Sequence, residues 1–489
     1  MKAIMVMFDS LCRRMLSPYG ATDIQTPGFQ RLAKHSLRFD QSWIGSMPCM
    51  PARRDLHTGR YNFLHRSWGP IEPFDDSLPE ILKNNGIYSH LITDHYHYWQ
   101  DGGATYHNRY ASAEFVRGQE VDEYKAAIID PVFPDNYDPS LSGWRKDLEK
   151  RDFINRSYMD TEEKMCTPQV FSLAEEFLEK FHAEDNWFLH LEAFDPHEPY
   201  FSSPECQALY PEEYDGPHFD WPFYRQVEES PEMVEHCKNR ARAMFSLCDK
   251  YLNHLLDVMD KHNLWDDTML IVNTDHGFMF GEHGWWAKNL PPSYCEVAHT
   301  PLFIWDPRSK HKNENRQGLA SMIDMAPTLL KFFNLEPTPD MDGKDLRPVI
   351  EDDTPVHDSL IFGYFGKEVN VTDGRYVYMH GSKNGQPINE YTLMPCYMNY
   401  RMSPELLATA TFVPPTESFP FAKGCPLLKI PQLSQGLEET LLFDLKEDYQ
   451  QNHQLDAPDI AARLAGEIRR WMVKNQAPEE QFTRLNLFC

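Results

Sequence analysis

Residues 49–59 read Cys49-Met50-Pro51-Ala52-Arg53-Arg54-Asp55-Leu56-His57-Thr58-Gly59, and they place a thiol, a rigid proline and a guanidinium close together before a Thr-Gly turn. A helix that starts near Pro51 would direct its free backbone N–H groups toward Cys49 and toward any bound anion. Arg53 can pair with an oxyanion through its planar set of donors. The spacing therefore predicts a nucleophile beside an anion-binding arginine. The ordinary alternative is a buried cysteine near a turn, with Arg53 on the surface.

The composition is that of a globular protein with more than one domain. The chain has 489 residues, of which 41% are hydrophobic and 25% charged, and this length suggests two or three domains. The formal net charge of -27 argues against nucleic acid or an anionic membrane as a general partner. An acidic chain that handles an anionic group must concentrate positive charge locally, so each lysine or arginine near the site is informative.

The first residues predict a strand, because Met1 and Lys2 lead into an apolar run that ends at Asp9. Residues 3–8 are too few for a signal-peptide core or a membrane span, and they are typical of a buried parallel strand. The ten cysteines are scattered, with no CxxC pair. We therefore expect reduced thiols and a cytoplasmic protein.

Strand-like and helix-like stretches alternate over residues 1–350. This order is typical of an α/β catalytic domain with a large, mostly parallel sheet between two layers of helices. We expect strands at 2–8, 88–93, 187–191, 268–272 and 301–305, and helices at 27–35, 78–85, 171–182, 233–262 and 322–333.

The pattern changes after residue 346. Short strands at 359–364, 375–380 and 440–445 and a final helix at 458–474 predict a smaller α+β domain with an antiparallel sheet over 351–489. Two segments interrupt these patterns. Residues 101–155 have weak periodicity, and we expect a long excursion that covers or shapes the site. Residues 385–435 are rich in proline, methionine and aromatic residues, and we expect a long loop or hairpin insertion that reaches the site or a neighbouring subunit.

Two predicted strands end in hard metal ligands. Asp9 follows the first strand, and Asp275 and His276 follow the strand at 268–272, where Gly277 gives the turn its freedom. Ligands of open α/β sheets bind beyond the carboxyl ends of the strands. Oxygen-rich ligation favours Ca²⁺, while one imidazole keeps Mn²⁺ open.

The pattern Cys-x-Pro-x-Arg-x-x-Leu-x-Thr-Gly resembles the signature of the type I sulfatases, which are formylglycine-dependent members of the alkaline phosphatase superfamily. The resemblance implies that Cys49 is oxidised to formylglycine, whose hydrated aldehyde is the nucleophile. It also implies one divalent cation. The positions that match the cation ligands of the family are Asp9, Cys49, Asp275 and His276.

Two further segments carry the resemblance into the substrate site. His197, in Pro196-His197-Glu198-Pro199-Tyr200, matches the family position that contacts the leaving group. Lys288, thirteen residues after Asp275, matches the lysine that clamps the substrate anion. The resemblance also makes Arg53 catalytic. His283 lies close to Lys288 in sequence and is a further candidate for substrate binding, or a structural histidine.

The chain departs from the common sulfatase pattern at two places. Ser10 stands where most sulfatases have a second acid. A single N-terminal aspartate with an Asp-His pair is more similar to the phosphonate monoester hydrolase branch. The run Asp94-His95-Tyr96-His97 falls where sulfatases carry Lys-x-His, and the lysine is missing. We expect His95 and His97 to share one face of an extended segment. One of them would touch the ester, with His95 favoured as catalytic and His97 as substrate-binding.

The resemblance continues to residues 442–448 and implies a sulfuric ester hydrolase. Its substrate would be a small anionic ester such as a sulfated sugar, an aryl sulfate or choline sulfate, and its partner a formylglycine-generating or anaerobic sulfatase-maturating enzyme. The same residues also fit a phosphonate monoester or phosphodiester hydrolase. A binding protein with unmodified Cys49 is an alternative of another class. We expect a homo-oligomer, with 385–435 as a contact.

Overall fold

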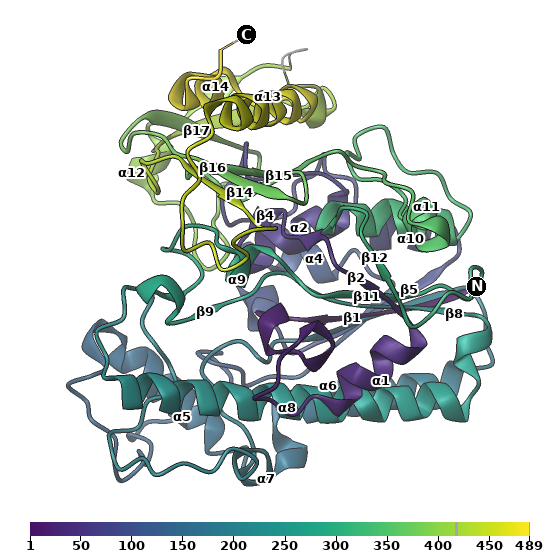
Figure 1. The fold of residues 1–489 in the computed structure, drawn as a ribbon, viewed down its shortest axis with the longest axis vertical. Helices are drawn as coiled ribbons and strands as arrows, with labels where there is room; N and C mark the ends of the chain where they lie inside the picture. Colours follow the sequence, from purple (N-terminus) through teal and green to yellow (C-terminus); the bar gives the residue numbers. More distant parts are fainter. Residues whose placement is uncertain (416–418, 489) are drawn as a thin grey trace.

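The computed structural model describes residues 1–415 and 419–488, and a large sheet lies at its centre (Figure 1). β1 pairs in parallel with β7 and β8, and β5 continues the parallel part from β7 to β6. Only β11 runs antiparallel to both of its neighbours in this sheet. A large, mostly parallel sheet is thus confirmed. Its strand order is β12 (Glu314–Arg316), β2 (Leu37–Phe39), β11 (Leu302–Trp305), β8 (Thr268–Thr274), β1 (Lys2–Phe8), β7 (Trp187–Ala193), β5 (Tyr88–Thr93), β6 (Ser112–Phe115).

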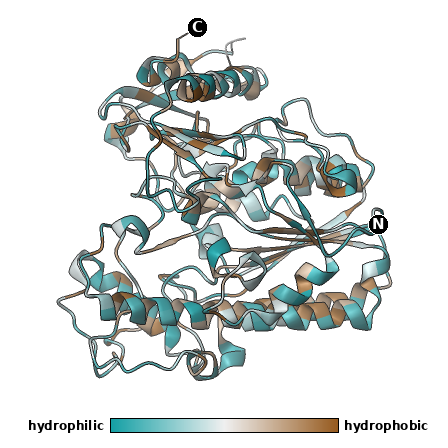
Figure 2. Cartoon of the chain, viewed as in Figure 1, coloured by the Kyte–Doolittle hydropathy of each residue, from teal (hydrophilic) through white to brown (hydrophobic). Residues whose placement is uncertain are grey.

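Helices cover both faces of this sheet, because alternate residues of its strands are apolar on both sides. Ile4, Val6 and Phe8 of β1 join one core, whereas Ala3 and Met5 join the other. Figure 2 shows hydrophobic residues concentrated in the central strands and along the flanking helices. The helices of the first core are α1 (Pro27–His35), α6 (Cys166–Phe181) and α8 (Pro231–Lys261); those of the second are α2 (Cys49–Thr58), α3 (Leu78–Asn84), α10 (Met325–Phe332) and α11 (Arg347–Asp352).

A second, five-stranded sheet is built mainly from the C-terminal part of the chain. Its strand order is β20 (Leu441–Asp444), β16 (Tyr376–His380), β15 (Val369–Thr372), β14 (Leu360–Tyr364), β4 (Ser46–Met47). Its pairings are antiparallel except between β14 and β4. β4 ends two residues before Cys49, so this sheet supports the start of α2. The expected domain boundary near residue 350 stays a prediction.

The two interrupting segments contain more regular structure than the sequence suggested. The excursion 101–155 includes β6 of the large sheet, α4 (Ala104–His107) and most of α5 (Lys146–Arg156). The sequence did not reveal α5 because its buried face includes the polar Asp152 and Asn155 beside Ile154. The insertion 385–435 forms a three-stranded antiparallel sheet of β17 (Pro387–Thr392), β19 (Leu427–Leu433) and β18 (Thr411–Val413), while its residues 416–418 lie outside the described residues.

The chain ends in two helices rather than one, α13 (Pro458–Lys474) and α14 (Glu479–Leu485). The remaining short elements are α7 (Pro204–Gln207), α9 (Cys295–Ala298), α12 (Pro404–Leu407), β3 (Ser42–Trp43), β9 (Met279–Phe280), β10 (Trp286–Ala287) and β13 (Ala320–Ser321). The nine cysteines within the described residues are free. In the same part of the chain, no helix is both long and apolar enough to cross a bilayer.

Candidate active site

Four potential metal ligands meet at the carboxyl ends of β1 and β8. Phe8 pairs with Thr274, so Asp9 and Asp275 emerge side by side, and His276 follows. Cys49 reaches the same point from the first residue of α2. One ligand atom from each of these four buried residues lies within 4.8 Å of the others. The structure therefore brings together the cation ligands that the sequence predicts.

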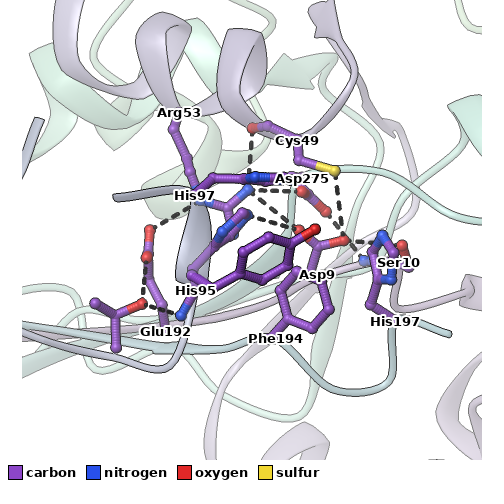
Figure 3. A network of polar contacts seen from close by, with 12 residues as sticks. Asp9, Ser10, Cys49, Arg53, His95, His97, Glu192, Phe194, His197 and Asp275 are labelled. Carbon is purple, nitrogen blue, oxygen red and sulfur yellow. Dashed lines mark hydrogen bonds and ion pairs between the residues drawn. The ribbon is translucent and has the colours of Figure 1, made fainter. Parts of the chain in front are cut away.

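Arg53 lies one helical turn after Cys49, where its guanidinium joins carboxylates from three strand ends (Figure 3). Its Nη1 lies 2.8 Å from Asp275 Oδ2 and 3.3 Å from Asp9 Oδ2, and its Nε lies 3.2 Å from Glu192 Oε1. All four side chains are fully buried. Arg53 thus balances several negative charges, in contrast to the surface arginine of the ordinary alternative.

Glu192 was missed in the sequence, although it follows the same rule as Asp9. It lies near the carboxyl end of β7, beside β1. Its carboxylate also accepts hydrogen bonds from Thr93 Oγ1 and Tyr98 OH, both at 2.9 Å. The signal available in the sequence was a single glutamate in the apolar stretch that forms β7.

Lys288 also reaches this cluster. Its Nζ lies 3.6 Å from Cys49 Sγ, donates to Ser10 Oγ at 3.1 Å and lies 3.8 Å from Asp9 Oδ1. Burial alone would lower the pKa of Lys288, but Cys49, Glu198 and the site acids raise it above its ordinary value. Lys288 therefore stays a cation next to the candidate nucleophile.

The pKa values of the two aspartates at the centre of the cluster are shifted in opposite directions. Burial would raise the pKa of Asp9, but Lys288, the imidazole of His95 and other nearby cations hold it well below its ordinary value. Burial and the neighbouring Asp9 raise the pKa of Asp275 to about 8. Burial and Asp9 also raise the pKa of the Cys49 thiol. An unmodified Cys49 would therefore be a protonated, weak nucleophile.

A cavity of about 830 Å³ opens over Cys49. It contains three of the predicted substrate contacts, His97, His197 and Lys288. Both interrupting segments contribute to its wall, through Glu120 and Leu148 from one and Asn399 and Gln435 from the other. Its other lining residues are Met47, Pro48, Ser67, Trp68, Tyr96, Gln100, Val121, Tyr224, Trp285, Asn289, Leu290, Tyr364, Phe365, Lys367 and Gly436.

His95 and His97 lie close together, but the prediction that they belong to one extended segment is wrong. Residues 96–99 form a 3₁₀ turn, in which Tyr98 turns inward to bind Glu192. The two imidazole rings are nevertheless 5.0 Å apart. His97 faces the cavity, whereas His95 is buried below it with Nε2 3.5 Å from Asp9 Oδ2.

His283 lies apart from this group. It adopts a positive φ of 52°, and its ring stacks on Tyr294 with the centroids 3.9 Å apart. Its Nε2 lies 3.8 Å from Glu296 Oε2. These contacts suit a histidine that packs a turn, and its assignment to substrate binding gains no support from its position.

Several cavity residues gave no signal in the sequence, among them Glu120 and Tyr224. Each comes from a loop or turn whose path depends on tertiary contacts. The prediction that residues 101–155 shape the site named the segment but not Glu120.

The profile of the family described as Sulfatase matches residues 2–335. The chain belongs to the sulfatase family and is a sulfuric ester hydrolase by class. It is 23% identical over 398 residues to a choline-sulfatase from Rhizobium meliloti, covering 71% of each chain. It is 21% identical over 401 residues to an arylsulfatase from Clostridium perfringens, covering 75% of this chain and 82% of that one.

Solved structures share the fold over nearly the whole chain. BT4656, solved in complex with its substrate D-glucosamine-2-N,6-O-disulfate, superposes with a TM-score of 0.66 at 15% identity, covering 99% of this chain and 98% of that one. The phosphonate monoester hydrolase of Agrobacterium radiobacter gives a TM-score of 0.64 at 17% identity, covering 97% of this chain and 96% of that one.

Proposed function

We propose that this protein hydrolyses the sulfate ester of a small alcohol at Cys49, releasing sulfate and the alcohol. The observation that carries the proposal is the position of Cys49 beside both a cation and a set of potential metal ligands. A buried lysine cation lies 3.6 Å from its Sγ, and Cys49 shares a metal-type cluster with Asp9, Asp275 and His276. An ester with an anionic head could be held there by Lys288 and by a cation bound at that cluster.

The four clustered residues fit a divalent cation. Among the described residues, Asp9 Oδ2 is buried without a hydrogen-bond partner, and the pair of adjacent aspartates lowers its own repulsion when a cation binds. Asp9, Asp275 and His276 would hold the ion together with the side chain at position 49. Oxygen donors favour Ca²⁺, with Mn²⁺ as the alternative because of His276. When bound, the cation would neutralise oxygens of the ester as a Lewis acid.

We also infer that Cys49 is converted to formylglycine by a separate maturating enzyme. Formylglycine would supply a hydrated aldehyde as an oxygen nucleophile. Three observations support this inference. The raised pKa of Cys49 disfavours a thiolate, and the ligand set around it is otherwise hard. α2 begins at Cys49, so the free backbone N–H groups of its first turn favour negative charge there.

The chain's own residues then divide the work. Lys288 binds an oxygen of the anionic head, and Arg53 fixes Asp9 and Asp275 while stabilising negative charge at position 49. His197 and His97 lie in the cavity wall, where the alcohol part of the ester would sit. His197 is the candidate donor of a proton to the leaving oxygen.

A phosphonate monoester or phosphodiester hydrolase is the second candidate function. Position 10 offers a hydroxyl rather than a second carboxylate, and this hydroxyl lies between Asp9 and Lys288. A site with one fewer negative charge also suits phosphorus esters. A turnover panel separates the two functions. We expect kcat/KM to be higher for an aryl sulfate than for phenyl phosphonate or a phosphodiester, with all activity absent in Cys49→Ala. Sulfate turnover that is slower by orders of magnitude would overturn the first choice.

Three smaller proposals accompany the main one. The protein acts in the cytoplasm, where its free cysteines would stay reduced. It forms a homo-oligomer, with 385–435 as a contact. If Cys49 remains a thiol in protein from its native host, the alternative of a binding protein without catalysis is favoured.

A further inference from the structure

His197 is the candidate proton donor, and its Nδ1 atom contacts Glu198. Nδ1 lies 2.5 Å from the backbone oxygen of Glu198 and 3.3 Å from Glu198 Oε2. A carbonyl oxygen can only accept, so Nδ1 carries the proton and donates it toward Glu198. Nε2 has no hydrogen-bond partner within the described residues, and His197 lines the cavity. The free nitrogen is therefore the one available to substrate.

Glu198 is a buried carboxyl group near Lys288, and its side chain contacts His197. Its side chain is 1% exposed, and in the described part of the chain its sole ion-pair partner is His197. Glu198 Oε2 has no hydrogen bond, while Oε1 accepts one from Tyr224 OH. Burial raises the pKa of Tyr224, so its hydroxyl stays a donor. Burying a carboxylate is costly unless a nearby positive charge compensates it.

We propose that Glu198, oriented by Tyr224, is a positioning residue that fixes the His197 ring with Nδ1–H toward Glu198 and favours the imidazolium whose Nε2–H is directed at the leaving oxygen of the ester. This role rests on the proposed ester hydrolysis and deepens it. Burial and Lys288 hold the pKa of His197 below its ordinary value, and Glu198 opposes that effect. Without Glu198 the imidazolium would be disfavoured where it is needed.

The proton transfer balances with the hydrolysis itself. As the attacking oxygen bonds to sulfur, the bond between sulfur and the ester oxygen breaks. The electron pair of the broken bond stays on the ester oxygen, which takes the proton from Nε2. His197 becomes neutral and regains a proton from the water that the hydrolysis consumes, whose hydroxyl group ends in the sulfate. An aliphatic alcohol needs this proton because its anion is a poor leaving group, whereas a nitrophenolate leaves without it.

The chain offers a matched control on the same cavity wall. Glu120 also accepts a hydrogen bond from a tyrosine, Tyr96 OH at 3.0 Å, but it makes no ion pair with His197 among the described residues. Glu198→Gln and Glu120→Gln each replace a carboxyl group that accepts a hydrogen bond from a tyrosine with an amide, and only the first removes the partner of His197.

The test measures sulfate release from a series of sulfate esters that runs from nitrophenyl to alkyl alcohols. We expect Glu198→Gln to lower kcat for alkyl esters roughly 10- to 100-fold and for the nitrophenyl ester far less. Tyr224→Phe should give the same trend with a smaller loss of kcat. It replaces Glu198→Gln as the test variant if Glu198→Gln does not fold. Glu120→Gln should change all esters by one common factor.

An equal loss across the series in Glu198→Gln, or a trend of the same steepness in Glu120→Gln, overturns the positioning role. A folded Tyr224→Phe with a uniform loss does the same. Failure of the proposed function looks different, because the wild-type protein would then release no sulfate from any ester in the series.

Discussion

Lys288 Nζ lies 3.6 Å from Cys49 Sγ although 239 positions separate the two residues in the chain. A cation so close to the candidate nucleophile is suited to binding an oxygen of the anionic head of the ester. Its contacts with Ser10 Oγ and Asp9 Oδ1 fix the ammonium in place before substrate binds. Charge that is already in place costs no reorganisation during the reaction.

Lys288→Met should therefore lower kcat/KM for an aryl sulfate on the order of 100- to 1,000-fold, because one preorganised charge contact is lost. Lys367→Met is the matched control, since Lys367 lines the same cavity but donates to the backbone oxygen of Asn289. We expect a much smaller loss there. Equal losses in steady-state assays of the two variants would contradict the role of Lys288.

Arg53→Met should destabilise the fold by about 3–5 kcal/mol, because it leaves buried carboxylates without their countercharge. Urea denaturation measures the loss. Adding Glu192→Gln to Arg53→Met should recover part of the stability, because it removes one uncompensated charge. If the second substitution lowers stability further, the carboxylates are not the cause.

Removal of divalent cations should lower the free energy of unfolding as well as the activity. Returning Ca²⁺ at about 100 times its dissociation constant should restore about 2.7 kcal/mol if only the folded state binds it. Mn²⁺ provides the comparison, and Asp275→Asn should abolish most of the effect. A shift of equal size in Asp275→Asn, or no shift in the wild type, would place the cation elsewhere or exclude it.

The raised pKa of Asp94 predicts that the free energy of unfolding depends on pH. Its Oδ2 and Asp195 Oδ1 both accept from Gln119 Nε2, at 2.8 and 3.0 Å. Burial and Asp195 raise the pKa of Asp94 to about 8. Since the folded state favours the protonated acid, its contribution is complete at low pH. That contribution is lost as pH rises from about 4, the ordinary pKa of the unfolded chain, through about 8.

Asp94→Asn should therefore lose less stability than the wild type between pH 4 and pH 8. Denaturation midpoints measured across that range test the effect. Parallel curves for the two proteins would show that Asp94 is already ionised in the fold.

The sequence was sufficient for the parts of the site that lie at regular strand ends. Asp9, Asp275 and His276 follow apolar runs, and the β1–β8 register places them together. The same reasoning applies to Glu192, which directly follows the strand expected at 187–191 and lies inside β7 in the structure. For residues 385–435 the sequence indicated a loop or hairpin but not the three-stranded sheet, because proline and aromatic residues obscure its alternation.

Other parts of the site depend on tertiary contacts that no local pattern contains. The 3₁₀ turn after His95 forms where Tyr98 reaches the buried Glu192, which is distant in sequence. Glu120 reaches the cavity from a loop held by Gln119 and Asn155. Glu198 stood beside His197 in the sequence, yet only the fold shows that its side chain turns back to the imidazole.

The most direct test of the account measures sulfate release against the fraction of Cys49 converted to formylglycine, determined by peptide mass spectrometry on the same preparations. The account predicts a straight line through zero, with no release from protein in which Cys49 remains a thiol. Sulfate release by the unconverted protein, or none from the fully converted protein with Ca²⁺ or Mn²⁺ present, would contradict it.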